Sequence, residues 1–181
     1  MMKESPQWAL GRAGEELVIR YLKAQGYFVT ATSFIEHGGA PLLEAMRGGV
    51  PLPDTMVSRE GSSKWVEVKT KSQPTRFVRT GRLEHGISLR LWRAYQQVVL
   101  DTGIPGALAI LQGAGGLLGV GDFGSIAPSI RIYDGTKMGP DGMVFFDWLA
   151  FSWVELGSVA LPLLEPIHAR GRENRLQGQL L

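Results

Sequence analysis

The segment from residue 52 to residue 71, LPDTMVSREGSSKWVEVKTK, constrains the fold more than any other part of the chain. Two short apolar stretches flank a polar loop at residues 60–63, which predicts a β-hairpin. Charged residues interrupt both strands: Asp54 opens the first, and Glu67 and Lys69 lie in the second. A fold that contains this hairpin must place three charged side chains on strands that otherwise suit a hydrophobic core.

The alternation of side chains along a strand suggests where these charges lie. Val66 and Val68 fall on one face of the second strand. Glu67 and Lys69 fall on the other face, roughly 7 Å apart, and Asp54 lies near them if the strands pair. Two carboxylates beside a lysine offer oxygen ligands for Mg²⁺ and a cation that stabilises developing charge. The alternative is an exposed salt bridge across the strands, because Glu-x-Lys tripeptides are common.

Residues 5–26 predict a helix that begins with an N-cap serine and a proline and ends at a glycine. At 100° per residue, Glu16 falls on the polar face between Arg12 and Arg20. Glu15 instead falls among the apolar side chains. A buried carboxylate there costs several kcal/mol unless cations or donors compensate it, so Glu15 is a candidate functional residue. The alternative is a fringe position from which Glu15 reaches water.

The rest of the chain alternates strand patterns with one further helix, which predicts a single domain over residues 1–167, with its core at about 5–123. The four glycines and three prolines of residues 37–53 predict a loop or an irregular hairpin. The tail at 168–181 is polar, as disordered tails are. The second helix is expected from Ser88 to Gly103, with Trp92 and Tyr95 in the core. Strands are expected at 27–34, 106–112 and 117–123 and in the stretches RIYDG and MVFFDW.

Several classes of site are excluded or disfavoured by composition. The chain has no cysteine, so it has neither disulfides nor thiolate metal sites. The N-terminus MMKESPQW lacks the apolar core of a signal peptide, and charges and a proline interrupt the apolar stretch at 143–167, so we expect a soluble, cytoplasmic protein with no membrane partner. His37, His85 and His168 show no metal-ligand spacing and are expected in loops or caps, where His85 could touch a nucleic acid.

Basic charge is concentrated in one segment. Residues 64–93 hold eight basic residues against two acidic ones, a local charge of +6 in a chain whose net charge is +2. Such a segment favours a polyanionic partner, because each neutralised phosphate releases counterions. The alternative is that many of these residues form an ordinary solvated surface. The candidates for contact with a nucleic acid are Lys71, Arg76, Arg79 and Arg82.

Taken together, these residues resemble a known superfamily. Pro53-Asp54, followed by Glu67-Val68-Lys69 on the next strand, is similar to the PD-(D/E)xK nuclease motif. The helix GRAGEELVIRYLKAQGY resembles the first helix of the Holliday-junction-resolvase-like members, in which a Gly-Glu precedes a Gly-Tyr or Gly-Phe. Glu15 and Gly26 match that spacing of eleven residues. The resemblance covers roughly residues 11–112, and residues 37–53 are longer than the simplest members require.

The resemblance implies an α/β, restriction-endonuclease-like core, with a central mixed β-sheet flanked by helices and here a β-rich C-terminal extension. It further implies a Mg²⁺- or Mn²⁺-dependent endonuclease that hydrolyses DNA phosphodiester bonds in recombination or repair, structure-specific in the resolvase-like members, which are implied to act as homodimers. The alternatives are a nuclease-fold DNA-binding or assembly protein that does not cut, with Asp54 and Glu67 facing apart, and a basic protein that binds an acidic partner. The implied roles are metal ligation by Asp54, Glu67 and the Val68 carbonyl, catalysis by Lys69, and an auxiliary acidic role for Glu15.

Overall fold

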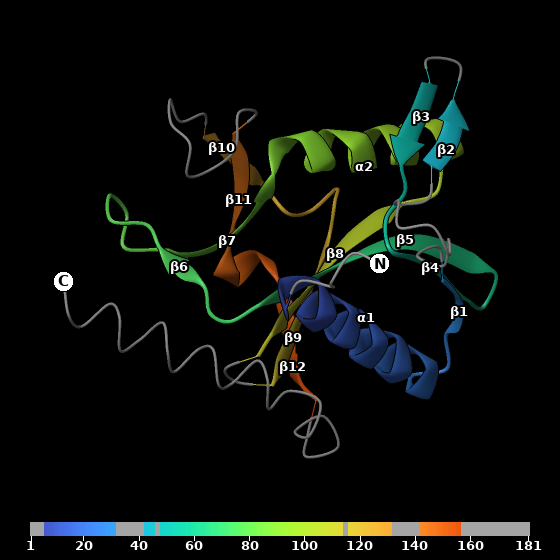
Figure 1. Cartoon of the computed structure of the whole chain (residues 1–181), viewed down its shortest axis with the longest axis horizontal. Coiled ribbons are helices and arrows are strands. Elements are labelled where there is room, and N and C mark those ends of the chain that lie inside the picture. Colours follow the sequence, from blue (N-terminus) through green and yellow to red (C-terminus); the bar gives the residue numbers. More distant parts are fainter. Residues whose placement is uncertain (1–5, 32–41, 46–47, 114–115, 132–141, 157–181) are drawn as a thin grey trace.

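The computed structural model describes residues 6–31, 42–45, 48–113, 116–131 and 142–156. The polar tail, His37, His168 and most of RIYDG lie outside these residues. The described elements follow the chain in the order shown in Figure 1, as helices α1 (Pro6–Ala24) and α2 (Leu89–Thr102), strands β1 (Phe28–Ala31), β2 (Leu42–Ala45), β3 (Gly48–Pro51), β4 (Thr55–Arg59), β5 (Ser62–Lys71), β6 (Thr75–Arg76), β7 (Leu83–Ser88), β8 (Gly106–Gln112), β9 (Leu117–Asp122), β10 (Pro128–Arg131), β11 (Met143–Asp147) and β12 (Ser152–Glu155), and a 3₁₀ turn at Trp148–Ala150.

The central sheet is mixed and has the strand order β1-β4-β5-β8-β9-β12. Strands β5 and β8 pair in parallel, and the other neighbours pair antiparallel. The parallel pair requires a crossover, and the segment that contains α2 supplies it. This arrangement confirms the α/β class with a mixed sheet flanked by helices.

The hairpin predicted from residues 52–71 is formed by β4 and β5. Its ladder runs from Thr55 opposite Val66 to Arg59 opposite Ser62. Glu60 and Gly61 make the turn with φ angles of 53° and 77°, and two successive positive φ values are typical of the tight turns that join twisted strands. The turn is therefore two residues long, and β5 begins earlier than the predicted loop allowed.

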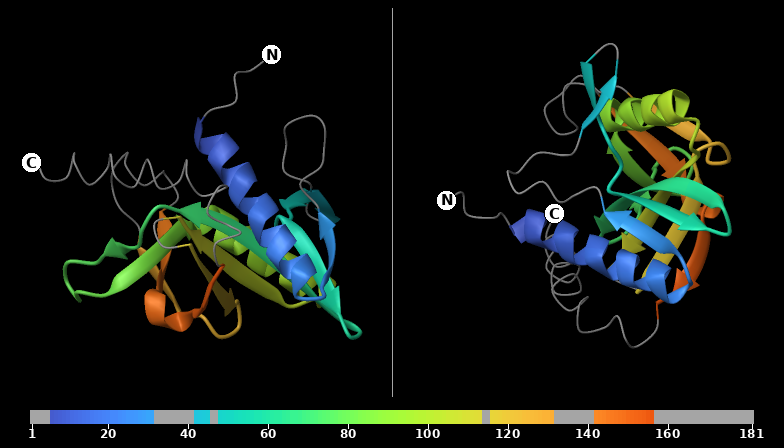
Figure 2. Two further views of the ribbon diagram at one scale, coloured as in Figure 1. Left: turned by 90° about the horizontal axis from the view of Figure 1, so that it is seen from below. Right: turned by 90° about the vertical axis from the view of Figure 1, so that its right-hand side faces the viewer.

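Two hydrophobic clusters lie on opposite faces of the sheet. Helix α1 packs across β5, as Figure 2 shows, and its Leu17 and Val18 contact the face that carries Val66 and Val68. Helix α2 packs with the other face. The strand alternation predicted for β5 is therefore correct, and it directs Glu67 and Lys69 to the α2 side.

The second cluster also contains side chains from the C-terminal strands. Trp92 and Tyr95 of α2 pack there with Leu108, and β11 contributes the fully buried Phe146. Strand β11 belongs to a four-stranded sheet of order β10-β11-β7-β6. Ser88 precedes α2 as predicted, although its side chain makes no capping hydrogen bond, and a left-handed Gly103 ends the helix.

Strands β2 and β3 pair antiparallel as a separate two-stranded sheet, in agreement with the irregular hairpin that was one of the two structures expected there. After β5, the basic segment forms a second hairpin. It contains β6 and the beginning of β7, which pair antiparallel around a turn at residues 77–82. The arginines of that segment therefore lie on a hairpin.

Candidate active site of carboxylates and a lysine

Asp54 lies where the ladder between β4 and β5 ends. The last paired residue of β4 is Thr55, opposite Val66. Two residues further along β5, the backbone N–H of Val68 donates to Asp54 Oδ2 over 2.8 Å. A carboxylate thus replaces the backbone acceptor that a longer β4 would supply. Since the N–H and C=O of one strand residue point to the same side, the Val68 carbonyl also faces this opening.

Glu67 is the most buried charged residue of the site, with 1% of its side chain exposed. Its Oε1 atom accepts a hydrogen bond of 2.6 Å from the Tyr95 hydroxyl and forms an ion pair with Lys69 Nζ. Its Oε2 atom is buried and has no hydrogen-bond partner among the described residues. One oxygen is therefore held in place while the other is available to a ligand.

Tyr95 was expected in the core, and it does pack there. Its hydroxyl, however, reaches across from α2 to the carboxylate, a contact that the sequence analysis missed. The spacing of Leu89, Trp92, Tyr95 and Val98 marks the buried side of the helix. The signal that could have revealed the contact is the phenolic hydroxyl itself, because a buried Tyr O–H usually has a hydrogen-bond partner.

Burial dominates the titration of the two carboxyl groups. It raises the pKa of Glu67 to about 7, with the negative charge of Asp54 adding to the rise and Lys69 opposing it. Burial also raises the pKa of Asp54, while Lys69 and the Val68 N–H oppose the shift. Burial alone would lower the pKa of Lys69, but Glu67 and Asp54 outweigh it and raise that pKa above its usual value. The lysine is therefore a protonated cation.

Glu15 comes from α1, on the opposite face of the sheet, and still acts on the same group of charges. Burial raises its pKa to about 7, Asp54 raises it further, and Lys69 and Arg12 lower it. The adjacent Glu16 is exposed and pairs with Arg20 over 2.6 Å. The structure therefore separates the two glutamates as the helical wheel predicts.

Gly14 explains how α1 comes close enough to place Glu15. A Cβ atom added at Gly14 would lie 1.9 Å from Oγ1 of Thr70 on β5 and 3.3 Å from a methyl carbon of Leu111 on β8. Only a residue without a side chain allows this approach of helix to strand. The Gly-Glu pair thus has a physical basis, since the glycine allows the close contact and the next residue, Glu15, interacts electrostatically with Asp54 and Lys69.

The charges in this cluster suit a divalent cation. Asp54 and Glu67 are both influenced by a single ammonium group, so the pair carries excess negative charge once both are ionised. Within the described residues, no group of three or more His, Cys, Asp or Glu side chains forms a complete metal site. Two carboxylates and a carbonyl are a partial set, and Mg²⁺ accepts such a set because it usually keeps several waters. The unpartnered Oε2 of Glu67 fits this interpretation.

The predicted nucleic-acid-binding residues lie beyond this cluster. Lys71 ends β5 and is partly buried, and burial together with the charge of Lys69 lowers its pKa. The exposed Arg76, Arg79 and Arg82 lie on β6 and the turn after it. These three arginines do not meet the carboxylates; they extend the basic surface away from the end of β5.

His85 contradicts the expectation of a loop residue that could touch a nucleic acid. It lies on β7 with 2% of its surface exposed, and its ring centroid is 5.7 Å from that of Trp148 and 6.0 Å from that of Trp153. Burial and the nearby charge of Lys71 lower its pKa to about 4. His85 is therefore a neutral core residue, and its position within the basic segment was misleading.

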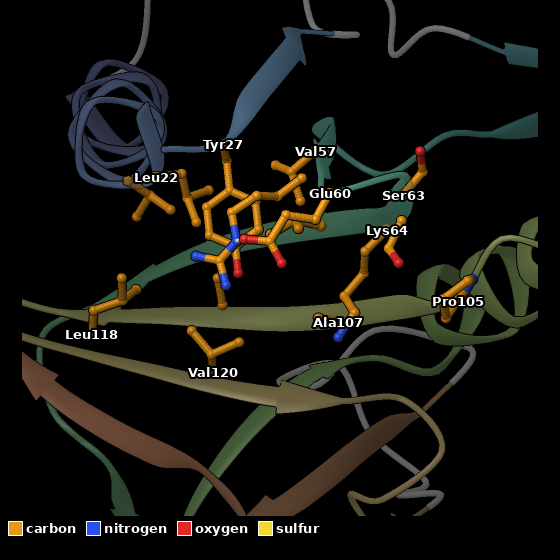
Figure 3. A pocket seen from close by; sticks show the side chains of 15 residues that line it. Leu22, Tyr27, Val57, Glu60, Ser63, Lys64, Pro105, Ala107, Leu118 and Val120 are labelled. Atoms are coloured by element: carbon orange, nitrogen blue, oxygen red, sulfur yellow. Dashed lines mark ion pairs between the residues drawn. The ribbon is translucent and has the colours of Figure 1, made fainter. Parts of the chain in front are cut away.

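A separate hollow of about 380 Å³ lies on the α1 face of the sheet (Figure 3). Apolar side chains that include Val57 and Val66 line it, with Arg59 and Lys64 at its polar side. It shares no residue with the carboxylate cluster. Because it offers only one carboxylate, Glu60, which pairs with Arg59 over 3.7 Å, it does not supply the ligand set of a metal site.

Comparison of the whole chain with solved structures identifies proteins of similar fold. The structure is similar to Hjc of Archaeoglobus fulgidus, a Holliday junction resolvase from an archaeal hyperthermophile, with a TM-score of 0.50 and 14% identity over 83% of this chain and 94% of that one. A nuclease from a fusselovirus matches with a TM-score of 0.39 and 9% identity over 91% and 93% of the two chains. No protein-family model and no curated protein sequence matches the chain. The likeness to Hjc shows that this chain shares the fold of that protein, with a central mixed sheet and flanking helices as the sequence resemblance implied.

The sequence also led us to expect no membrane-spanning segment. Among the described residues, no helix is both long and apolar enough to cross a bilayer.

Proposed function

We propose that this protein is a divalent-metal-dependent deoxyribonuclease that cuts DNA phosphodiester bonds internally. The observation that carries the proposal is the meeting of Asp54, Glu67 and Lys69 at the open end of β4, with one Glu67 oxygen buried and without a partner among the described residues. Asp54 and Glu67 influence each other's pKa, which argues against the non-cutting alternative, in which they face apart. The resolvase-like fold supports the same class of activity.

In this proposal Asp54, Glu67 and the Val68 carbonyl hold a Mg²⁺ or Mn²⁺ ion. Such an ion polarises a phosphate and lowers the pKa of a bound water. Lys69 is kept protonated by its carboxylate neighbours, so it stabilises negative charge on the reacting phosphate rather than removing a proton. Tyr95 fixes the orientation of Glu67 through its 2.6 Å hydrogen bond.

Glu15 has a different part in the proposal. Its pKa of about 7 lets it gain or lose a proton near neutral pH, which suits an auxiliary acid or base beside the metal site. Lys71, Arg76, Arg79 and Arg82 would contact the phosphate backbone and position the DNA. A four-way junction as substrate is part of the same proposal, supported by the likeness to a Holliday junction resolvase, and a homodimer as the acting form is the part that the sequence resemblance implies.

The experiment compares the wild-type protein with Glu67→Gln, which keeps the shape of the side chain and removes its charge. Each is incubated with plasmid duplex, an immobile four-way junction and single-stranded DNA, in Mg²⁺, Mn²⁺ or EDTA. We expect metal-dependent cleavage by the wild type and a loss of at least about 100-fold in the variant, the scale of other electrostatic contributions to catalysis. Circular dichroism should show the same fold in both. Cleavage in EDTA, or an undiminished rate for Glu67→Gln, would refute the proposal.

A further inference from the structure

The turn between β6 and β7 displays an apolar side chain to solvent. Val78 is 94% exposed, more than any other large apolar side chain in the described part of the chain. A single exposed valine is ordinary on a protein surface and needs no explanation. The position of Val78 at the tip of a hydrogen-bonded, basic hairpin, however, does require an explanation.

The turn is held by several hydrogen bonds. The N–H of Phe77 donates to the Arg82 carbonyl over 2.8 Å, and the N–H of Gly81 donates to the Phe77 carbonyl over 2.7 Å. The Arg76 guanidinium donates to the Gly81 carbonyl over 3.2 Å. Gly81 has a φ of 71°, which favours glycine. These contacts fix the shape of the loop from which Val78 projects.

The base of the turn is anchored to the body of the protein. The guanidinium of Arg131 on β10 lies 3.6 Å from the centroid of the Phe77 ring and forms an ion pair of 2.7 Å with the mostly buried Glu84. Arg82 forms a second ion pair, with Asp147 of β11, over 3.2 Å. The tip is therefore presented by a supported base, and Figures 1 and 2 show the turn extending away from the rest of the molecule.

Basic side chains surround the tip. Arg76, Arg79 and Arg82 are exposed, and Arg79 lies 5.8 Å from the centroid of the Phe77 ring. The described residues from 76 to 82 contain no acidic side chain. An apolar tip flanked by Arg76 and Arg79, with Arg82 paired to Asp147 at its base, complements a surface that is anionic outside and apolar inside. Stacked DNA bases bordered by phosphates form such a surface.

We propose that the turn at residues 77–82 is a DNA wedge, in which Val78 inserts between bases while Arg76 and Arg79 contact the adjacent phosphates. Apolar wedges that enter base steps must separate stacked bases. The cost is smallest where bases are already unpaired or poorly stacked. The wedge therefore makes the protein prefer branched or interrupted duplexes over continuous ones. This inference rests on the proposed function, because it takes DNA as the ligand.

A second copy of the chain is a less suitable occupant of this tip. Two such turns brought together would place like charges side by side, which is unfavourable. Lys69 and Lys71 on β5 precede the hairpin directly, so a phosphate backbone that reaches the carboxylate cluster can continue to the arginines. Charge and connection to the site thus favour DNA.

The test measures binding in EDTA, so that cleavage does not interfere. The probes are an immobile four-way junction with 2-aminopurine beside the branch point and a continuous duplex of the same arm sequence. The variants are Val78→Ser, which makes the tip polar, Val78→Leu, which keeps it apolar, and Leu100→Ser as a control. Leu100 is an apolar side chain on α2 that is 76% exposed.

For Val78→Ser we expect about tenfold weaker binding to the junction, because one valine side chain loses its burial. Its binding to the continuous duplex should be unchanged, and the rise in 2-aminopurine fluorescence should be lost. Val78→Leu and Leu100→Ser should behave as the wild type. Equal loss on both DNAs, no loss on either, or a Val78→Ser protein that changes its sedimentation state would overturn the inference.

Cleavage in Mg²⁺ separates this result from the proposed function. If the wild type cuts DNA and Val78→Ser loses no preference for the junction, the wedge is wrong and the nuclease remains. If the wild type binds the junction through Val78 but does not cut in any metal, the wedge is supported and the proposed nuclease activity fails.

Discussion

Replacing Tyr95 by phenylalanine removes one hydroxyl from the protein and tests how the candidate site is tuned. That hydroxyl donates to Glu67 Oε1 over 2.6 Å in a buried setting. Burial is the main cause of the Glu67 pKa of about 7, and the Tyr95 hydrogen bond is one of the contacts that hold it down. Phenylalanine fills nearly the same volume and leaves no unpaired donor, so we expect the fold to remain intact.

The size of the effect follows from the strength of the lost hydrogen bond. A hydrogen bond to a charged group contributes roughly 1.5–3 kcal/mol, and each pKa unit corresponds to about 1.36 kcal/mol. The Tyr95→Phe change should thus raise the pKa of Glu67 by at least about one unit, to about 8 or above. The ionised fraction at pH 7 would then fall from about half to about a tenth.

A metal ion binds the ionised carboxylate, so the loss has a definite sign. A carboxyl group with a higher pKa needs a higher pH to ionise, and the Mg²⁺ affinity of Tyr95→Phe at pH 7 should fall about fivefold and recover above about pH 9. The acid limb of the pH–rate profile for DNA cleavage should move upward by about one unit.

The assay is calorimetric Mg²⁺ binding together with single-turnover cleavage from pH 5.5 to 9.5. Tyr27→Phe is the matched control, because Tyr27 lines the separate hollow on the α1 face and its hydroxyl should not affect the profile. If Tyr95→Phe has the same acid limb and the same Mg²⁺ affinity as the wild type, the hydrogen bond does not tune Glu67 and the reasoning fails.

Two further predictions concern the helix and the basic hairpin. Glu15→Gln should lower the cleavage rate at saturating Mg²⁺ by at least about 100-fold, the usual contribution of a general acid or base. Glu16→Gln, which loses only an exposed ion pair, should change the free energy of unfolding by less than about 1 kcal/mol and leave the rate unchanged; equal losses in the two variants would remove Glu15 from the site. Replacing Arg76 and Arg79 together by alanine should reduce the slope of log binding constant against log salt by about one to two units, at about 0.9 per phosphate contact. An unchanged slope would place the DNA elsewhere.

The parts of the fold that depend on local periodicity could be predicted from the sequence. The apolar stripe of α1, the alternation in β5 and the stop at Gly103 all follow from rules that act over a few residues. The same rules separated Glu15 from Glu16. The motif from Pro53 to Lys69 then predicted an α/β fold with a central mixed sheet, and the likeness to the archaeal resolvase confirms that fold.

Long-range pairing could not be predicted in the same way. Nothing local in residues 83–88 indicates that β7 pairs with β11, some sixty residues later. That pairing buries His85, whose neighbours in sequence are Glu84 and Gly86 and whose neighbours in space include Trp148 and Trp153. The contact between Tyr95 and Glu67 likewise depends on the crossover that places α2 over the sheet. Sequence rules assign such a side chain to the core without revealing what its polar atom meets.

The position of the candidate site follows from the end of a strand. Glu15 and Lys69 belong to opposite faces of the central sheet, and a complete strand between them would keep their charges apart. Strand β4, however, is paired only as far as Thr55, so β5 continues without a backbone neighbour on that side, and Asp54 satisfies the exposed N–H of Val68. Through this opening the helix and the strand place charges of both signs close together. The unpaired edge therefore brings together residues that strand alternation alone would separate, because the Val68 N–H is left to Asp54 and the charges of Asp54 and Lys69 act on Glu15.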